Sequence, residues 1–467
     1  MNQGQPVRSA APARSKGRVE KSGAKIEEHV LANGMRVLLA ERHLDPVVAV
    51  MVWYRVGSRN ETEREAGVSH FLEHMMFKGS RRYGKGMVDQ LTTQLGGTNN
   101  AFTTADHTAY WFELASDRWE KALEIEADRM RGLLLDASEF DAEKQVVLEE
   151  LAMGEDDPWR MLSQEVQAAL VARHPYRRPV IGYKDTLERL GVAEMREYYE
   201  RFYHPGNATL VVCGDIDPKR ALERVRALFE SIPAGKPFAE ADPARAPLAE
   251  PRGEQRFTLR WDDDARRLCM AWPTVKVGED DDYALDLAST LFTGGRLSRF
   301  YRKLVIDERL ATSVSTHNDT RVEGGAFWLF AECAQGAKPE QLERAIDAEI
   351  ERLAREKPAA KELERNKRML VAGEAYDSET VSDIAEELGE FAVDLDWRAS
   401  LTTMARIEAT SGETVRATVA RLLKRERRVV GWCLPKKELA RGKGSRRQRA
   451  RARDARSFEI IDAEEGA

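Results

Sequence analysis

The feature that constrains this chain most is a short amphipathic segment at residues 67–77, Gly-Val-Ser-His-Phe-Leu-Glu-His-Met-Met-Phe. Its apolar side chains recur at the i, i+3, i+4, i+7, i+8 spacing that predicts a helix with one face in a protein core. They are Val68, Phe71, Leu72, Met75 and Met76. On this helix His70, Glu73 and His74 point in nearly the opposite direction. The two histidines therefore face water or a second element and do not fill the core.

Two histidines four residues apart, with a glutamate directly before the second, form the H-x-x-E-H pattern, the inverse of the H-E-x-x-H zinc helix. At helical spacing both imidazoles can reach one metal ion. The carboxylate of Glu73 shares their face and can hold a water molecule beside the metal. The pattern predicts a zinc hydrolase. The alternative is a chance match or a pair of structural histidines, which the polar position of His70 and His74 disfavours.

An open catalytic zinc site needs a third protein ligand, usually a carboxylate. A helix predicted at residues 138–153 offers one, and Ser138 resembles the first residue of a capping box that opens it. Glu143 and Glu150 lie nearly in register after two turns, whereas Glu149 points away from both. One member of the matched pair can ligate the metal while the other supports the site. Without the histidine segment upstream, these carboxylates are more typical of a solvated helix face.

Five segments carry further motifs. They are residues 67–79, 96–103 (Gly-Gly-Thr-Asn-Asn-Ala-Phe-Thr), 146–151 (Val-Val-Leu-Glu-Glu-Leu), 174–182 and 204–215. In order and spacing they resemble the insulinase/pitrilysin family of zinc metallopeptidases, and within it the short branch close to the mitochondrial processing peptidase. The resemblance implies that His70, His74 and Glu150 hold one zinc ion per chain. It also implies that Glu73 is the general base and that Glu143 is the supporting glutamate.

The resemblance further implies the fold class, which is α+β, with two related domains that face each other around a cavity, each an antiparallel sheet packed with helices. A length of 467 residues agrees, because it exceeds what one hydrophobic core usually holds. We expect a zinc-bearing domain at 25–232, a linker at 233–255 and a second domain at 256–435, with disordered tails at 1–24 and 436–467. The C-terminal tail is crowded with Lys and Arg, so its alternative role is an electrostatic tether to an anionic partner.

Residues 100–112 are rich in Thr and aromatic residues after a Gly-Gly turn, which predicts a strand. By the resemblance, Asn100 and Ala101 bind the substrate, and an edge strand here could pair with an extended peptide. The alternative for Asn100 is a turn residue. We do not assign His107 as a metal ligand, because a lone histidine on a polar strand usually has no such role.

One departure from the family concerns an arginine followed seven residues later by a tyrosine, which single-chain members carry in the second half to hold the substrate carbonyl and the oxyanion. Val305 and Thr312 occupy these positions here. We therefore expect a zinc endopeptidase that cleaves peptides or unfolded targeting segments as the metal-bearing subunit of a two-chain enzyme. Its partner would be a homologous subunit without the zinc motif that carries the Arg/Tyr pair. The alternatives are a self-sufficient homodimeric processing peptidase and a non-catalytic assembly subunit, and the intact zinc residues disfavour the latter.

Composition narrows the class of protein further. A formal net charge of −6 argues against a generic nucleic-acid binder, and no apolar stretch approaches the length of a membrane span. Four cysteines without C-x-x-C spacing predict buried free thiols. The first 24 residues lack the apolar core of a signal peptide. We expect a soluble protein, in the cytoplasm or the periplasm.

Overall fold

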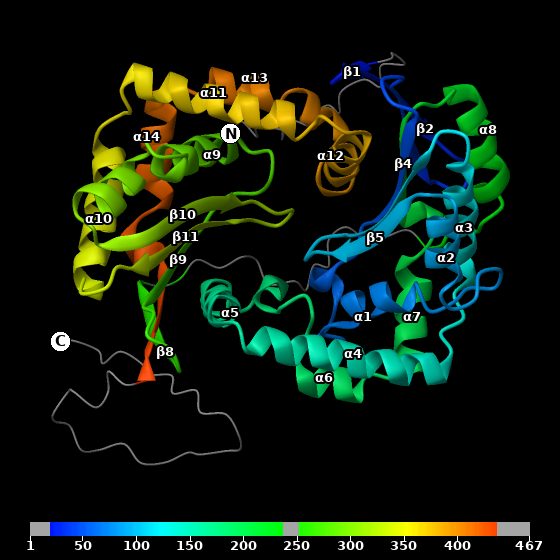
Figure 1. The fold of residues 1–467 in the computed structure, drawn as a ribbon, viewed down its shortest axis with the longest axis horizontal. Helices are drawn as coiled ribbons and strands as arrows, with labels where there is room; N and C mark the ends of the chain where they lie inside the picture. The colour runs from blue at the N-terminus through cyan, green and yellow to red at the C-terminus, as the bar shows by residue number, and fades with distance from the viewer. Residues whose placement is uncertain (1–18, 237–250, 252, 437–467) are drawn as a thin grey trace, which may run out of the picture.

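The computed structural model describes residues 19–236, 251 and 253–436. Two sheets with flanking helices form the α+β fold that the sequence predicts, and the two halves of the chain face each other (Figure 1). Most of each expected tail and most of the expected linker lie outside the described residues. A short strand, β1 (Val19–Lys21), is paired with the next strand, so the predicted tail is wrong for its last residues.

The first sheet has seven strands in the order β1-β2-β3-β7-β4-β6-β5. After β1 these are β2 (Ala24–Val30), β3 (Arg36–Glu41), β7 (Ala208–Gly214), β4 (Val47–Tyr54), β6 (Thr108–Ala115) and β5 (Thr98–Thr103). Asn33-Gly34, a dipeptide typical of hairpin turns, lies in the tight turn between β2 and β3, where Gly34 has a φ of 86°. Among the described strands β5 pairs only with β6, so it forms an edge of this sheet.

β4 is apolar along its whole length because both faces of the sheet are covered. Val48, Val50 and Val52 pack into the core that the helices of the first half make. Met51 and Trp53 point to the opposite face. The helices of the first half are α1 (Val68–Met75), α2 (Met87–Gln94), α3 (Glu120–Gly132), α4 (Ala137–Glu155), α5 (Pro158–Leu170), α6 (Lys184–Arg189), α7 (Val192–Phe202) and α8 (Pro218–Phe229).

The second sheet has five strands in the order β10-β11-β9-β12-β8. They are β10 (Ala311–Asp319), β11 (Ala326–Cys333), β9 (Arg267–Pro273), β12 (Val429–Pro435) and β8 (Gln255–Trp261). The helices of this half are α9 (Asp280–Thr293), α10 (Pro339–Arg355), α11 (Ala360–Tyr376), α12 (Val381–Asp394), α13 (Thr403–Ala409) and α14 (Gly412–Leu422). Most of them cover one face of the sheet.

One helix of each half packs on the sheet of the other half, and both helices lie between the halves (Figure 1). α12 packs on β4 and β7 of the first sheet, where its Gly389 touches Trp53. An added Cβ at Gly389 would lie 2.0 Å from the indole nitrogen of Trp53, so only glycine permits this approach. α5 packs on β9 and β12 of the second sheet. Its Leu162 and Val166 belong to the core on the face of that sheet opposite α9, α10 and α14. This exchange couples the two cores.

Two local predictions need correction. The sheets are not purely antiparallel, because β3 with β7 and β12 with β8 are parallel pairs. α4 begins at Ala137, and its N-cap is Asp136, whose carboxylate accepts the backbone N–H groups of Ser138 and Glu139. The four cysteines are buried and free, as predicted. Among the described residues, no helix has the length and apolar content needed to cross a bilayer.

Candidate active site

The histidine helix, α1, is fixed at its N-terminus by a buried carboxylate. Glu61 accepts the backbone N–H groups of Gly67 and Ser69, each at 2.9 Å. This satisfies two of the donors that a helix start leaves free. Burial raises the pKa of Glu61 to about 8. Gly67 has a φ of 96°, and a Cβ there would lie 2.5 Å from the carbonyl oxygen of Ile181, so the helix entry requires glycine.

The predicted apolar stripe of α1 is buried, and the histidine face is directed toward α4. Three donor groups meet there. The Nε2 atom of His70 lies 3.8 Å from Oε2 of Glu150, and the Nε2 atom of His74 lies 3.7 Å from the same oxygen. The two imidazole rings are 4.7 Å apart between centroids. One donor atom from each residue falls within 4.8 Å of the other two, a spacing that fits one metal ion.

Glu143 fixes the orientation of the second histidine. Its Oε1 lies 2.9 Å from Nδ1 of His74, and its Oε2 lies 2.5 Å from Nζ of Lys78. Burial alone would raise the pKa of Glu143, but the hydrogen bonds from Lys78 and His74 hold it below its usual value. The ionised carboxylate binds the Nδ1 side of the ring, so Nε2 remains directed at Glu150. Glu149 is exposed and lies outside this group.

The first histidine is kept neutral by its surroundings. Burial, together with electrostatic interactions with His74 and Arg160, lowers the pKa of His70 to about 4. A neutral imidazole is the form that ligates metals. Its Nδ1 is buried and makes no hydrogen bond to any described residue. Two imidazole nitrogens and one carboxylate oxygen are the donor set of many catalytic zinc sites, so these residues fit zinc.

Glu73 lies next to the three donors and is held by the edge strand. The hydroxyl of Thr103, the last residue of β5, donates to Oε2 of Glu73 at 2.5 Å. Burial raises the pKa of Glu73 despite this hydrogen bond. On the same strand Asn100 is exposed, and its Oδ1 accepts the N–H of Ala101 at 2.9 Å. Asn100 pairs with β6 in the strand register, so it is not the turn residue of the alternative interpretation.

Sequence reasoning missed three residues around this site. Lys78 lies one helical turn beyond His74, a spacing that could have drawn attention to it. Thr103 closes the segment that the family resemblance had already singled out. Arg160 gave no sequence signal, because it approaches His70 only through the packing of α5. Its guanidinium lies against α4, where a Cβ at Gly154 would come within 2.5 Å of it.

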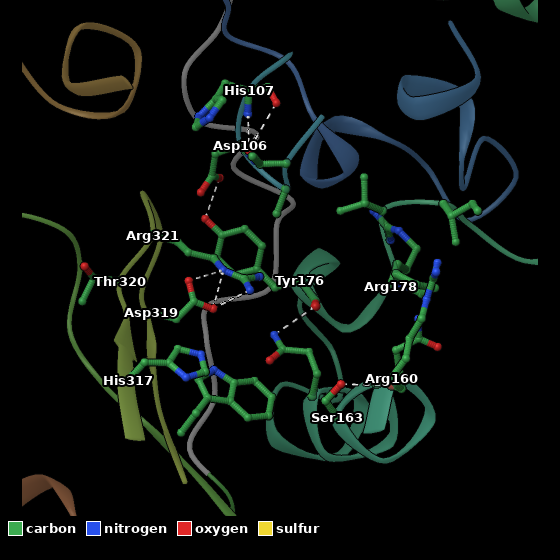
Figure 2. Close-up of a pocket in the computed structure, with 18 of the residues that line it drawn as sticks. Asp106, His107, Arg160, Ser163, Tyr176, Arg178, His317, Asp319, Thr320 and Arg321 are labelled. Atoms are coloured by element: carbon green, nitrogen blue, oxygen red, sulfur yellow. Dashed lines mark hydrogen bonds and ion pairs between the residues drawn. The ribbon is translucent and has the colours of Figure 1, made fainter. Parts of the chain in front are cut away.

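A cavity of about 580 Å³ lies between the halves, beside this site. Its lining begins at Thr104, the residue after Thr103, and includes Arg160. His107 and Asp106 lie toward one end of the cavity and Ser163 and Arg160 toward the other (Figure 2). The cavity therefore adjoins the turn that follows the edge strand and the start of α5.

The hairpin of β10 and β11 is anchored in the first half by a polar network. Glu323 near its tip lies 2.9 Å from Nη1 of Arg59 and 2.6 Å from Nε2 of His174. Arg59 also binds Asp106 at 2.8 Å, and the hydroxyl of Tyr176 donates to Asp106 at 2.7 Å. The turn that follows β5 is thus tied to the second half.

The two positions of the missing Arg/Tyr pair lie in the second half, one on β10 and the other in the segment before β10. Thr312 is exposed on β10, the edge of the second sheet, and its hydroxyl contacts Glu332. Val305 lies in the π-helical segment Tyr301–Asp307 and packs against the second core. Neither side chain carries the charge or the phenol of the family pair.

Both halves of the chain match known family models. Residues 36–184 match the family model described as insulinase (peptidase family M16), and residues 189–370 match the peptidase M16 inactive domain. The chain is 29% identical to the zinc protease PqqE of Helicobacter pylori, covering 80% of this chain and 84% of that protein. It is 30% identical to an uncharacterized zinc protease of Mycobacterium leprae, covering 69% and 73%.

Solved structures show the same architecture. A protease from Helicobacter pylori superposes with a TM-score of 0.84 at 26% identity, over 88% of this chain and all of that one (100%). A peptidase M16 inactive domain from Pseudomonas fluorescens superposes with a TM-score of 0.80 at 20% identity, covering 88% of this chain and 98% of that chain. At that identity the second likeness supports the fold alone.

Proposed function

Because this chain belongs to the insulinase (M16) family of peptidases, we propose that it is a zinc-dependent endopeptidase that binds one zinc ion through His70, His74 and Glu150. The observation that carries the proposal is the convergence of these three donors, with Glu73 beside them. A zinc ion held there would supply Lewis acidity toward a water molecule and toward a peptide carbonyl. The names of the relatives as zinc proteases support the same metal.

The chain's own residues provide the proton transfers. Glu73 accepts a proton from the attacking water and returns it to the leaving amine. Its raised pKa suits both steps, because a carboxylate with a pKa nearer neutrality can take up and release a proton readily. Thr103 fixes one oxygen of Glu73, which leaves the other for water. Glu143 is a positioning residue that acts through His74.

Substrate binding is assigned to the free edge of β5. Its outer backbone groups can form a ladder with an extended peptide, which would bring the scissile bond toward Glu73, the hydrogen-bond partner of Thr103 at the end of this strand. Asn100 and Ala101 lie on this edge strand, with the Asn100 side chain exposed. An unfolded or targeting segment suits this mode, because backbone pairing requires an extended chain.

We further propose that a second, homologous subunit completes the enzyme. Val305 and Thr312 lack the donors that hold the substrate carbonyl in single-chain members, and the segment that contains them matches a model described as an inactive domain. The partner would lack the zinc motif and carry the Arg/Tyr pair. A self-sufficient homodimer and a non-catalytic assembly subunit remain the alternative functions, and the ordered donor set disfavours the latter.

Metal analysis of the purified protein tests the proposal directly. His70→Ala, His74→Ala and Glu150→Gln should each lose zinc, because each removes one of three ligands. Glu149→Gln is the matched control, since it removes the adjacent carboxylate of the same helix and should leave zinc unchanged. Stoichiometric zinc in all three ligand variants would disprove the assignment.

A further inference from the structure

A second group of metal-binding side chains lies at the end of the cavity, away from the histidine helix. His107 follows β5 in the turn that leads to β6, while Glu390 and Asp394 are one helical turn apart on α12. One imidazole nitrogen and one oxygen of each carboxylate lie within 4.8 Å of one another. The group therefore joins the first half of the chain to the helix that the second half lends it.

The histidine of this group is held rigidly. His107 is only 3% exposed, and its ring meets the edge of Trp53 at 5.1 Å between centroids. Its Nδ1 lies 3.0 Å from Oδ1 of Asp394. Trp53 also packs against Gly389 of α12. This contact fixes the position of the imidazole relative to the helix that carries the two carboxylates. Such a group loses little conformational entropy when it binds an ion.

The face of α12 that contains Glu390 and Asp394 carries a third acidic residue. Glu386, Glu390 and Asp394 recur at intervals of four on α12, so they share one face of the helix. Glu390 makes no hydrogen bond or ion pair with any described residue, in contrast to Asp394, which has His107. The His107–Asp394 ion pair accounts for two of the three groups, and the exposed carboxylate of Glu390 lies within 4.8 Å of a donor atom of each.

We propose that His107, Glu390 and Asp394 bind a second divalent metal ion, which bridges the two halves of the chain. One imidazole nitrogen and two carboxylate oxygens form a donor set that suits Mn²⁺ or Zn²⁺, and water from the cavity can complete the coordination. This ion would be structural, because it ties α12 to the turn that follows β5. It is distinct from the zinc of the histidine helix and goes beyond the proposed peptidase function.

The test uses the full chain with the histidine helix disabled. The His70→Ala/His74→Ala double variant is incubated with MnCl₂ or ZnCl₂, desalted and analysed for bound metal. We expect one ion per chain in this background. Adding Glu390→Gln should weaken binding by about 10-fold or more, since it removes one ligand. Glu386→Gln is the matched control, because it removes the same charge one turn earlier and should leave the ion bound.

A thermal melt provides a second readout that does not depend on activity. At ~100-fold excess of metal over its Kd, the melting temperature of the double variant should rise by roughly 2–3 °C. At the same metal concentration the Glu390→Gln variant should lose about half of this rise or more, while the Glu386→Gln variant keeps it. Either of two results would overturn the proposal, namely a double variant that binds no metal or equal binding by Glu390→Gln and Glu386→Gln. Both are independent of whether the chain hydrolyses peptides.

Discussion

Replacement of Gly389 by alanine should destabilise the protein, although alanine is the better helix former. At an ordinary helix position the exchange stabilises by up to ~1 kcal/mol. At residue 389, however, the new Cβ would lie 2.0 Å from Nε1 and 2.2 Å from Cε2 of Trp53, whose indole is fully buried. Overpacking of this kind costs about 1–3 kcal/mol or more. We expect a net loss of about 1–2 kcal/mol.

Gly373→Ala on α11 is the matched control, because the nearest neighbouring atom lies 4.0 Å from its added Cβ. This variant should be more stable than the wild type, because alanine has the higher helix propensity and its Cβ meets no clash. The two variants should therefore differ by roughly 2–3 kcal/mol in the free energy of unfolding, in opposite directions from the wild type. Urea titration followed by circular dichroism and Trp fluorescence measures this difference. Equal stability of both variants would refute the claim that α12 is packed against Trp53 at this closeness.

Three further predictions concern the proposed peptidase. Glu73→Gln should keep its zinc and its fold but lose hydrolysis of an unstructured peptide by a factor of about 10²–10⁴, because proton transfer is lost; unchanged turnover would exclude Glu73 as the base. Glu143→Gln should lower metal affinity or activity by about 10–100-fold through His74, whereas Glu149→Gln should be near neutral, and equal effects would contradict the assigned geometry. The isolated zinc-loaded chain should hydrolyse peptides slowly, because its activation free energy lacks the roughly 3 kcal/mol that an oxyanion donor contributes. A homologous partner with the Arg/Tyr pair should restore the activity. Full turnover without a partner, unchanged by Thr312→Ala, would favour a self-sufficient enzyme.

The elements with strong local signals were predictable from the sequence. Local residue patterns indicate the apolar run of β4, the Asn33-Gly34 turn and the apolar stripe of α1. For the strand and the helix, the reason is that burial of one or both faces determines which residues are apolar. The parallel pairing of β3 with β7 was not predictable, since the two strands are separated by more than 160 residues. The N-cap of α4 was misplaced because Asp136 and Ser138 are both good capping residues, and only the backbone decides between them.

The site divides in the same way. His70, Glu73 and His74 share one helix, so their spacing alone predicted that they lie together. Glu150 reaches them from another helix, and its choice over Glu149 depended on register. The second cluster escaped notice because His107 has no acidic neighbour at helical spacing in the sequence. Its partners on α12 lie more than 280 residues away and meet it only through the exchange of helices.

That exchange has a consequence for synthesis of the protein. The first sheet is complete once β7 has left the ribosome, but its second face stays bare until α12 follows about 180 residues later. At ~5–20 residues per second the nascent chain spends roughly 10–40 s with Met51 and the indole of Trp53 in water. During that time the exposed apolar face is a ready target for a chaperone or for a neighbouring nascent chain. Only when the last fifth of the polypeptide appears does the first half acquire its complete core.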